Sequence, residues 1–368
     1  MKKATSLTKI ALQKFKKNFW GVFSFCFLVA CLLVAIFAYA IAPDDSQNAN
    51  QMHLSIHSKK PGFQVTMLTI PSAVDEGNGI TDFFFGKKNT ATEIPITQYK
   101  LKKQAIEITE YTADDMEGLE KEYALSLFPN AQTVTEIPKQ YITQRTFHLG
   151  TDKYGRDLLS RMLIGIRISL SIGFVAVFIS LVIGITLGAI GGYFGGKIDA
   201  AIMWIINVTW SIPTLLLVIA ITLALGKGFW QVFIAVGLTM WVEVARVVRG
   251  QVMSVKRMQY VTAARALGYT DFRIITKHIL PNAMAPVIII SAANFAGAIL
   301  IESGLSFLGI GAQPPMPSWG GIIKDHYSYI ILGKPFLAII PGIAIMSLVT
   351  AFMLIGNALR DALDVRNT

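Results

Sequence analysis

Six long apolar stretches dominate this sequence and limit what it can fold into. They cover roughly residues 20–42, 168–191, 200–226, 229–248, 284–309 and 335–357. A helix needs about 20 apolar residues to cross the hydrocarbon core of a bilayer, because every backbone amide must be hydrogen-bonded within the helix there. Since 53% of the 368 residues are hydrophobic and 15% are charged, a soluble domain of this length could not bury so much apolar surface. The sequence therefore predicts an all-α polytopic membrane protein.

The formal net charge of +10 follows the expected membrane topology. Lys and Arg gather before the first stretch, in the loop after the fourth and after the sixth. With six spans these segments share one side of the membrane, and the excess of Lys and Arg marks that side as cytoplasmic. Residues 1–19 and 358–368 are thus predicted to be cytoplasmic ends. Nucleic-acid binding is not expected, because orientation already accounts for the positive charge.

The first stretch, residues 20–42, contains both cysteines, Cys26 and Cys31. The residues before Cys31 look like a lipoprotein cleavage site, but the apolar run continues past it and is longer than the core of a signal peptide. We therefore expect an uncleaved first transmembrane helix. No spacing of potential ligands fits a metal site, and no nucleophile-and-base motif is present, so neither a metal centre nor a membrane enzyme is predicted.

A polar segment, residues 43–150, follows the first span and is placed outside the cytoplasm by the topology. Alternating apolar and polar residues predict strands at 63–70 and 105–109, whereas 113–128 has helical spacing. The expectation is a small α+β extracytoplasmic domain inserted between the first and second spans. An insertion without chemistry of its own and a membrane-tethered binding or sensor domain are the alternatives.

Residues 151–167 predict a short interfacial amphipathic helix, which Thr151 or Asp152 could cap. Anchoring of the second span and a part in an outer gate both remain open for this segment. The second span has a glycine at every fourth position, which predicts close packing against another helix. These glycines are Gly184, Gly188, Gly192 and Gly196.

Two features within the membrane core raise the question of chemistry. The stretch 191–198 nearly spells a phosphate-binding loop, but Ile198 stands where a hydroxyl would hold magnesium, so ATP hydrolysis by this chain is not expected. Glu302 lies in an otherwise apolar run, where a carboxylate is costly and marks a pathway, a gate or a hydrogen bond between helices. Asn294 and Pro213 are grouped with it as possible pathway or gate residues.

The loop after the fourth span, residues 249–282, is the most informative segment. A helix is predicted to run to Leu267 and to stop at Gly268 as its C-terminal cap. Thr270 is the predicted N-cap of a second helix, which ends near Pro281 where the next span begins. The expected product is a compact helix–turn–helix that another protein can approach closely, because its outer surface has small alanine side chains.

This loop resembles the EAA loop of ATP-binding-cassette (ABC) importer permeases, in which a short coupling helix sits in a groove of the ATPase subunit. Thr262 stands where the family pattern has Glu. The stretches 150–157, 191–196, 304–315 and 317–320 also match the C-type permease subunit of dipeptide and oligopeptide importers. The predicted ATPase-coupling residues are Tyr260, Thr262, Ala263, Ala264, Arg265, Leu267, Gly268, Asp271, Leu280 and Pro281.

The resemblance implies six transmembrane helices of the type I ABC importer permease kind in the cytoplasmic (inner) membrane. Spans two to six would form a five-helix permease core over residues 168–357. Implied partners are a homologous second permease, two ABC ATPases that hold ATP and Mg, and an extracytoplasmic substrate-binding protein, while this chain itself binds no cofactor. Peptide import is the expected function, with transport of nickel or another small solute, or an ion-coupled secondary carrier, as alternatives.

Overall fold

The computed structural model describes residues 7–71, 79–88, 91–112, 118–226 and 228–363. The chain forms two compact units. Unit 1 comprises Met1–Leu32, Ser169–Gln313 and Ile343–Thr368, and unit 2 comprises Leu33–Ile168 and Pro314–Gly342. Three of the boundaries between the units fall within the helices α2 (Phe19–Ile36), α6 (Leu158–Phe194) and α14 (Phe336–Leu363).

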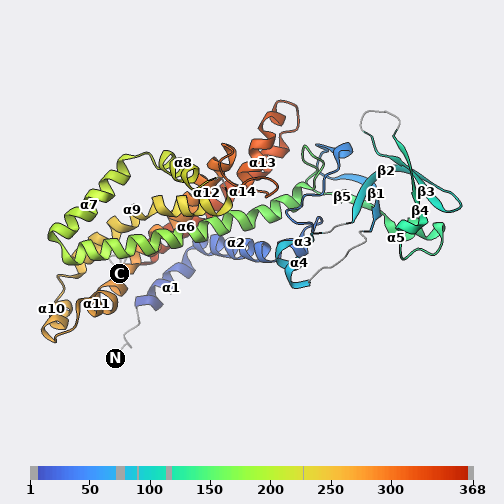
Figure 1. The fold of residues 1–368 in the computed structure, drawn as a ribbon. Coiled ribbons are helices and arrows are strands. Elements are labelled where there is room, and N and C mark those ends of the chain that lie inside the picture. The colour runs from blue at the N-terminus through green and yellow to red at the C-terminus, as the bar shows by residue number, and fades with distance from the viewer. Residues whose placement is uncertain (1–6, 72–78, 89–90, 113–117, 227, 364–368) are drawn as a thin grey trace. The chain divides into compact units, whose positions relative to one another are not determined.

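Unit 1 consists of long apolar helices and one short helical loop (Figure 1). Within the described residues, five helices are long and apolar enough to cross a membrane, or six if the bent pair α7 and α8 forms one span. The elements are α1 (Leu7–Lys17), α2 (Phe19–Ile36), α6 (Leu158–Phe194), α7 (Gly196–Ser211), α8 (Thr214–Leu225), α9 (Phe229–Val255), α10 (Gln259–Ala266), α11 (Asp271–Arg273), the π-helix η4 (Ile274–Ile279), α12 (Leu280–Phe307) and α14 (Phe336–Leu363).

The second span begins earlier than the hydropathy suggests. Helix α6 is one continuous helix of 37 residues, so the separate interfacial helix predicted over 151–167 is wrong. The Asp157 side chain caps its first turn by accepting a hydrogen bond from the Ser160 amide at 2.9 Å. The apolar residues that suggested an interfacial helix are instead the first turns of α6.

The third span is not a single straight helix. The stretch predicted over 200–226 is the pair α7 and α8, which meet at an angle of 94°. Pro213 has no amide hydrogen to donate and forces the residue before it into extended backbone, which Ile212 adopts at φ −91° and ψ 128°. The proline therefore ends α7 and lets α8 restart in a new direction.

The predicted helix end near Pro281 is also wrong. Residues Asp271–Phe307 form one helical run of 37 residues. Pro281 cannot donate the usual bond to the carbonyl four residues earlier, and the wider π turn of η4 lies directly before it. The helix passes the proline because its hydrogen-bond ladder has already widened.

The glycines of α6 pack against α9 of the same chain. A Cβ added at Gly188 would lie 2.5 Å from the Ala245 carbonyl oxygen, and one at Gly192 would lie 2.8 Å from the Arg249 carbonyl oxygen. Only glycine permits this backbone contact. Gly196 lies outside this contact, since its φ is +56° and an added Cβ would meet nothing within 4 Å.

Unit 2 contains a five-stranded antiparallel sheet with strand order β4-β3-β2-β1-β5. Thr66 pairs with Ile96 on one side and with Gln144 on the other, which fixes β1 in the middle of its neighbours. The strands are β1 (Phe63–Ile70), β2 (Thr92–Leu101), β3 (Ala105–Glu110), β4 (Glu120–Ala124) and β5 (Ile142–Phe147). The helices are α3 (Ala38–Ile41), η1 (Leu54–Ile56), α4 (Gly79–Phe85), η2 (Leu125–Leu127), η3 (Val134–Glu136), α5 (Ile137–Tyr141), α13 (Trp319–His326) and η5 (Tyr327–Ile330).

The two predicted strands of the insertion are confirmed as β1 and β3. The predicted helix over 113–128 is wrong where the structure describes it, because β4 and η2 occupy its second half; residues 113–117 lie outside the described residues. Residues 120–124 form a strand because they pair with β3, with Tyr123 opposite Ile106. A pairing of residues distant in sequence has overridden a local helical pattern.

Candidate functional site

The 249–282 loop folds around a capped helix, α10. Gly268 has φ +78°, a left-handed backbone that a side chain would strain. Its amide donates to the Arg265 carbonyl at 2.9 Å, and the Tyr269 amide donates to the Ala264 carbonyl at 3.2 Å. This pair of bonds is the Schellman arrangement that closes a helix at glycine. The predicted stop at Gly268 is therefore confirmed.

The predicted restart after Gly268 is confirmed as well. The Thr270 hydroxyl caps α11 by accepting from the Arg273 amide at 3.4 Å. Asp271 in the first turn accepts a hydrogen bond from the hydroxyl of Tyr193, a residue near the end of α6. This bond joins the turn of the loop to a long helix.

Tyr193 is the anchor of the loop and is 3% exposed. Lys256 donates to its carbonyl oxygen, and the guanidinium carbon of Arg265 lies 5.2 Å from its ring centroid. The sequence reasoning did not select this residue. Its signal was present in the glycine-rich stretch 191–196, where one large polar aromatic stands between small residues.

The two consecutive alanines of the loop, Ala263 and Ala264, differ in exposure. Ala264 is 3% exposed and packs with Val261 and Val248 in the core of unit 1, so the expectation that it contributes to an approachable outer surface is wrong. Ala263 is exposed, as are Thr262, Arg265 and Asp271. Consecutive residues of a helix lie about 100° apart around its axis, so one alanine can be buried while the next is exposed.

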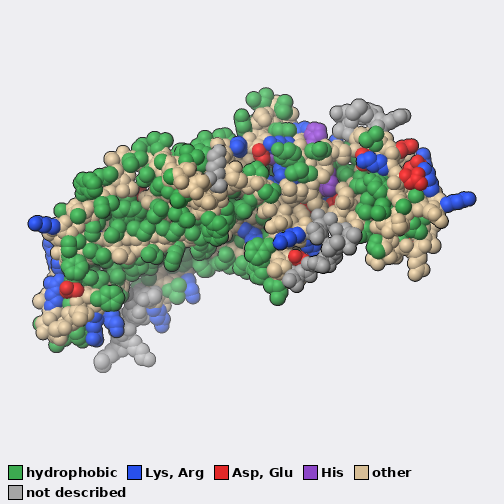
Figure 2. Space-filling model, viewed as in Figure 1, with side chains coloured by type: hydrophobic (Ala, Val, Ile, Leu, Met, Phe, Trp, Pro, Cys, Tyr) green, Lys and Arg blue, Asp and Glu red, His purple; other side chains and the backbone are tan. Residues whose placement is uncertain are grey.

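Large apolar side chains make up much of the outer surface of the loop. Leu267 is 71% exposed, Phe272 is 77% exposed and Tyr260 is 43% exposed. Phe272 was not selected from the sequence. Figure 2 shows Lys and Arg gathered at the same end of unit 1, around α10 and α11. An exposed apolar surface rimmed by charge is typical of a protein–protein contact.

The last two predicted coupling residues lie farther along the same helical run. Leu280 is half-buried and packs against the core of unit 1, while Pro281 is exposed. Eight of the ten predicted residues are thus exposed, Leu280 is half-buried and Ala264 is buried. Their role in coupling stays a prediction.

Glu302 on α12 is fully buried. Its carboxylate accepts from the Ser306 hydroxyl at 2.7 Å, and Ser306 in turn accepts from the Ala312 amide at 3.1 Å. A Cβ at Gly311 would lie 2.2 Å from the same hydroxyl oxygen. Glu302 therefore holds the turn that follows α12 against the helix end.

Asn294 and Pro213 lie near a cavity of about 320 Å³ in unit 1. The cavity is lined by Asn294 from α12, by Glu243 from α9, and by Ile212 and Thr214, the neighbours of Pro213 at the bend between α7 and α8. Pro213 and Glu302 are not among its lining residues. The structure thus brings Asn294 and the bend together and leaves Glu302 in a different environment.

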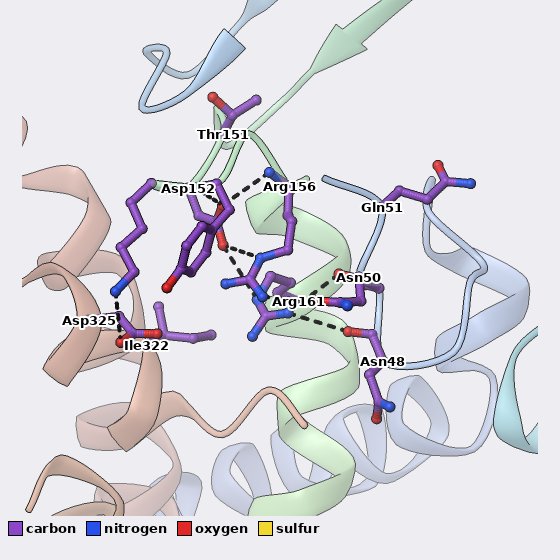
Figure 3. A network of polar contacts seen from close by, with 12 residues as sticks. Asn48, Asn50, Gln51, Thr151, Asp152, Arg156, Arg161, Ile322 and Asp325 are labelled. Atoms are coloured by element: carbon purple, nitrogen blue, oxygen red, sulfur yellow. Dashed lines mark hydrogen bonds and ion pairs between the residues drawn. The ribbon is translucent and has the colours of Figure 1, made fainter. Parts of the chain in front are cut away.

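The stretch 150–161 forms a buried ionic network in unit 2 (Figure 3). Asp152, fully buried, accepts from Nε of Arg156 at 2.6 Å and lies 3.7 Å from Nε of Arg161. Arg156 also donates to the Asn50 side chain at 3.0 Å. Gly155 is required at its turn, because a Cβ would lie 1.8 Å from the His53 carbonyl oxygen. The network ties the segment after the first span to the start of α6.

The same stretch is also bonded to α13. Lys153 forms an ion pair with Asp325 at 3.0 Å, and its amide donates to Nε2 of His326 at 3.1 Å. Nδ1 of His326 lies 2.7 Å from the Ile322 carbonyl oxygen. Because Nε2 accepts a hydrogen bond and Nδ1 faces an acceptor, the imidazole is neutral with its proton on Nδ1. Burial lowers the pKa of His326 below its ordinary value.

A second group of charged side chains, half-buried around the buried His53, lies in the sheet domain. Arg145 forms an ion pair with Glu93, and Nε2 of His53 lies 3.8 Å from the same carboxylate. Burial, with the charge of Arg145 adding to it, lowers the pKa of His53 to about 4. Among the described residues no group of three or more potential ligands could hold a metal ion.

A family model described as "Binding-protein-dependent transport system inner membrane component" matches residues 184–367, which is half of the chain. The chain belongs to this family. A second model, "N-terminal TM domain of oligopeptide transport permease C", matches residues 6–61. Both matches confirm the resemblance that the loop and the glycine-rich stretches indicated.

Similar proteins come from several bacteria. The glutathione transport system permease protein GsiD of Pectobacterium atrosepticum is 41% identical over 59% of this chain and 71% of that protein. The dipeptide transport system permease protein DppC of Bacillus subtilis is 39% identical over 65% of this chain and 75% of that protein. The oligopeptide transport system permease protein OppC of Escherichia coli is 41% identical over 60% and 72%.

Membership of this family makes the chain a multi-pass inner-membrane transport subunit of an ABC importer and not an enzyme. An ATPase and a substrate-binding protein are the partners that such a permease requires in general. The predicted fold class, an all-α permease with a small sheet-containing insertion, is confirmed.

Proposed function

We propose that this chain is one of two permease subunits of an ABC importer that carries peptides across the inner membrane, with both its termini in the cytoplasm. A homologous second permease would face it across the pathway, and two ATPases would hold ATP and Mg, while this chain binds no cofactor. The peptide assignment is supported by the printed names of its relatives, which are dipeptide, oligopeptide and glutathione permeases.

One observation supports the coupling role: the 249–282 loop exposes large apolar side chains beside a turn that is held by several hydrogen bonds. Leu267 and Phe272 project from the two sides of the Gly268 turn. The Tyr193–Asp271 bond holds that turn to α6. This turn and its two apolar side chains can bind in a groove on an ATPase and transmit the movement of the ATPase to α6.

Transport then follows from differential binding of ATP. Closure of the ATPase dimer on ATP would pull the loop, and α6 would carry the displacement along its length to the rest of the helices. The two permeases would alternate between inward-open and outward-open forms, since each ligand favours the form that it binds more tightly.

Leu267→Asp tests this role, because the side chain is exposed and its replacement does not disturb the core. A charge placed in an apolar contact is costly, so we expect ATPase copurification to be lost and dipeptide uptake by reconstituted complexes to fall at least about tenfold. Leu119→Asp, at a site 66% exposed in the sheet domain, is the matched control and keeps both. Unchanged uptake by Leu267→Asp would refute the coupling role, whereas absence of peptide uptake by the unaltered complex would refute the substrate class.

A further inference from the structure

The cavity in unit 1 has two polar groups that the coupling role does not use. Its volume of about 320 Å³ lies at the lower end of the range for ligand pockets, about 300 to 1,000 Å³. Its walls come from the bend between α7 and α8, from α9 and from α12. Its apolar lining residues include Trp210, Leu217, Met240 and Ile301.

Asn294 presents a donor without an acceptor to this cavity. The residue is 3% exposed, and its Nδ2 has no hydrogen-bond partner among the described residues. Buried amide groups are nearly always paired, so an unpaired one that lines a cavity is free to donate to an acceptor from outside the chain. Asn294 also lies midway along α12, far from both helix ends.

Glu243 presents a negative charge to the same cavity. It lies midway along α9, where a carboxylate is costly in a membrane helix and marks a pathway. Within the part of the chain that the structure describes, it forms no ion pair. Arg246, one turn farther along α9, donates to the Asn207 side chain at 2.8 Å, and its guanidinium carbon lies 3.5 Å from the ring centroid of Trp210, a lining residue of the cavity. Its Nε has no hydrogen-bond partner among the described residues.

Three hydroxyls also line the cavity. Thr209 and Thr239 each donate to a carbonyl of their own helix, at 2.9 Å and 2.8 Å, while Thr214 stands at the start of α8. The cavity therefore offers one carboxylate, one amide donor and the Thr214 hydroxyl among apolar side chains. That combination fits a ligand with a cationic donor and a neutral acceptor close together, and it repels a ligand whose nearest group is a carboxylate.

We propose that this cavity binds the amino end of the transported peptide, with Glu243 accepting from the ammonium group and Asn294 donating to the first carbonyl oxygen. This inference rests on the proposed peptide import function and deepens it. It assigns part of the substrate selection to the permease itself, through two side chains midway along their helices. Selection by charge would then occur in the membrane as well as in the binding protein.

The test compares a dipeptide with its N-acetylated form, which has the same side chains but no ammonium group. Uptake of both by the reconstituted complete transporter gives a ratio of rates. The binding protein contributes equally to this ratio in every permease variant, so a change in the ratio reports the permease. For Glu243→Gln we expect free-dipeptide uptake to fall about tenfold and the preference over the acetylated form to fall by the same factor.

Asn294→Leu should reduce uptake of both peptides alike, because both retain the carbonyl oxygen. Glu120→Gln, an exposed carboxylate on β4, is the control and should leave both rates unchanged. If the unaltered transporter takes up peptides and Glu243→Gln shows the same ratio as wild type, the inference is overturned while the proposed function stands. If the unaltered transporter takes up neither peptide, both are overturned together.

Discussion

The two ends of α6 are fixed by opposite means. At its N-terminal end, buried polar groups hold the first turns: Asp157 caps the helix, and Arg161 lies beside Asp152. At its C-terminal end, glycines remove every side chain from one face, so that α9 packs directly on the α6 backbone at Gly188 and Gly192. One end depends on charges that are present and the other on side chains that are absent.

The difference follows from what each environment can supply. Between helices in lipid there is no hydrophobic force to bring surfaces together, so close backbone contact supplies the attraction. Where backbone loops meet a helix end, amides and carbonyls need partners, and buried ions with several hydrogen bonds supply them. A larger side chain at one of the glycines should therefore disrupt the packing of α6 on α9. Removal of a charge should disrupt the ionic network at the other end.

The largest effect is expected from Gly188→Leu. An added Cβ would lie 2.5 Å from the Ala245 carbonyl oxygen, and a backbone oxygen cannot move aside without displacing α9. We expect no monodisperse protein after detergent extraction, measured by size-exclusion chromatography. Gly250→Ala is the matched control on α9, because an added Cβ meets nothing within 4 Å there. Normal behaviour of Gly188→Leu would show that the α6–α9 contact is not essential.

A smaller loss is expected from Asp152→Asn. The substitution keeps the shape of the side chain but leaves Arg156 and Arg161 buried without their counter-charge. Breaking a buried ion pair in this way costs about 3–5 kcal/mol. The protein should still be obtained, with its Tm lowered by more than about 5 °C in a fluorescence melt.

The control for Asp152→Asn is Glu122→Gln, which breaks an ion pair of 2.8 Å between exposed side chains of Glu122 and Lys102. Exposed pairs contribute little because water screens them. Its Tm should match that of the unaltered protein. Equal Tm values for Asp152→Asn and Glu122→Gln would contradict the structural role assigned to the network.

Local patterns predicted the features that depend on local chemistry. The alternation at 63–70 predicted β1, because a half-buried strand must alternate its faces. Gly268 and Thr270 predicted the turn of the loop, because a left-handed cap favours glycine and an N-cap favours a hydroxyl.

Features that depend on distant residues were missed or wrong. The sequence could not show that Ala264 faces the core while Ala263 does not, since both are small and adjacent. Tyr193 stands out in the glycine-rich stretch 191–196, but its bond to Asp271 depends on how α6 and the loop come together. The cavity that Glu243 lines could not be predicted either, since it forms only where α9 meets α12 and the bend at Pro213.

The smallest expected effect is a pH dependence of stability, which only the N-terminal end of α6 should show. The network end contacts His326, which must be neutral to accept from the Lys153 amide, whereas the glycines have nothing to titrate. Because burial lowers the pKa of His326 in the folded protein, the unfolded chain binds protons first as the pH falls below about 6.5. Stability is therefore complete above that pH and declines below it, by at most about 1.4 kcal/mol per pH unit for one histidine.

Tm measured from about pH 7.5 to about pH 5.5 should fall more steeply for the unaltered protein than for His326→Asn. Asparagine cannot titrate, but its amide can still donate to the Ile322 carbonyl that Nδ1 of His326 contacts. His53 has a lowered pKa as well and is present in both proteins, so it contributes the same acid sensitivity to each curve. The difference between the slopes thus reports His326 alone, and parallel curves would mean that protonation of this residue does not reach the network that holds the start of α6.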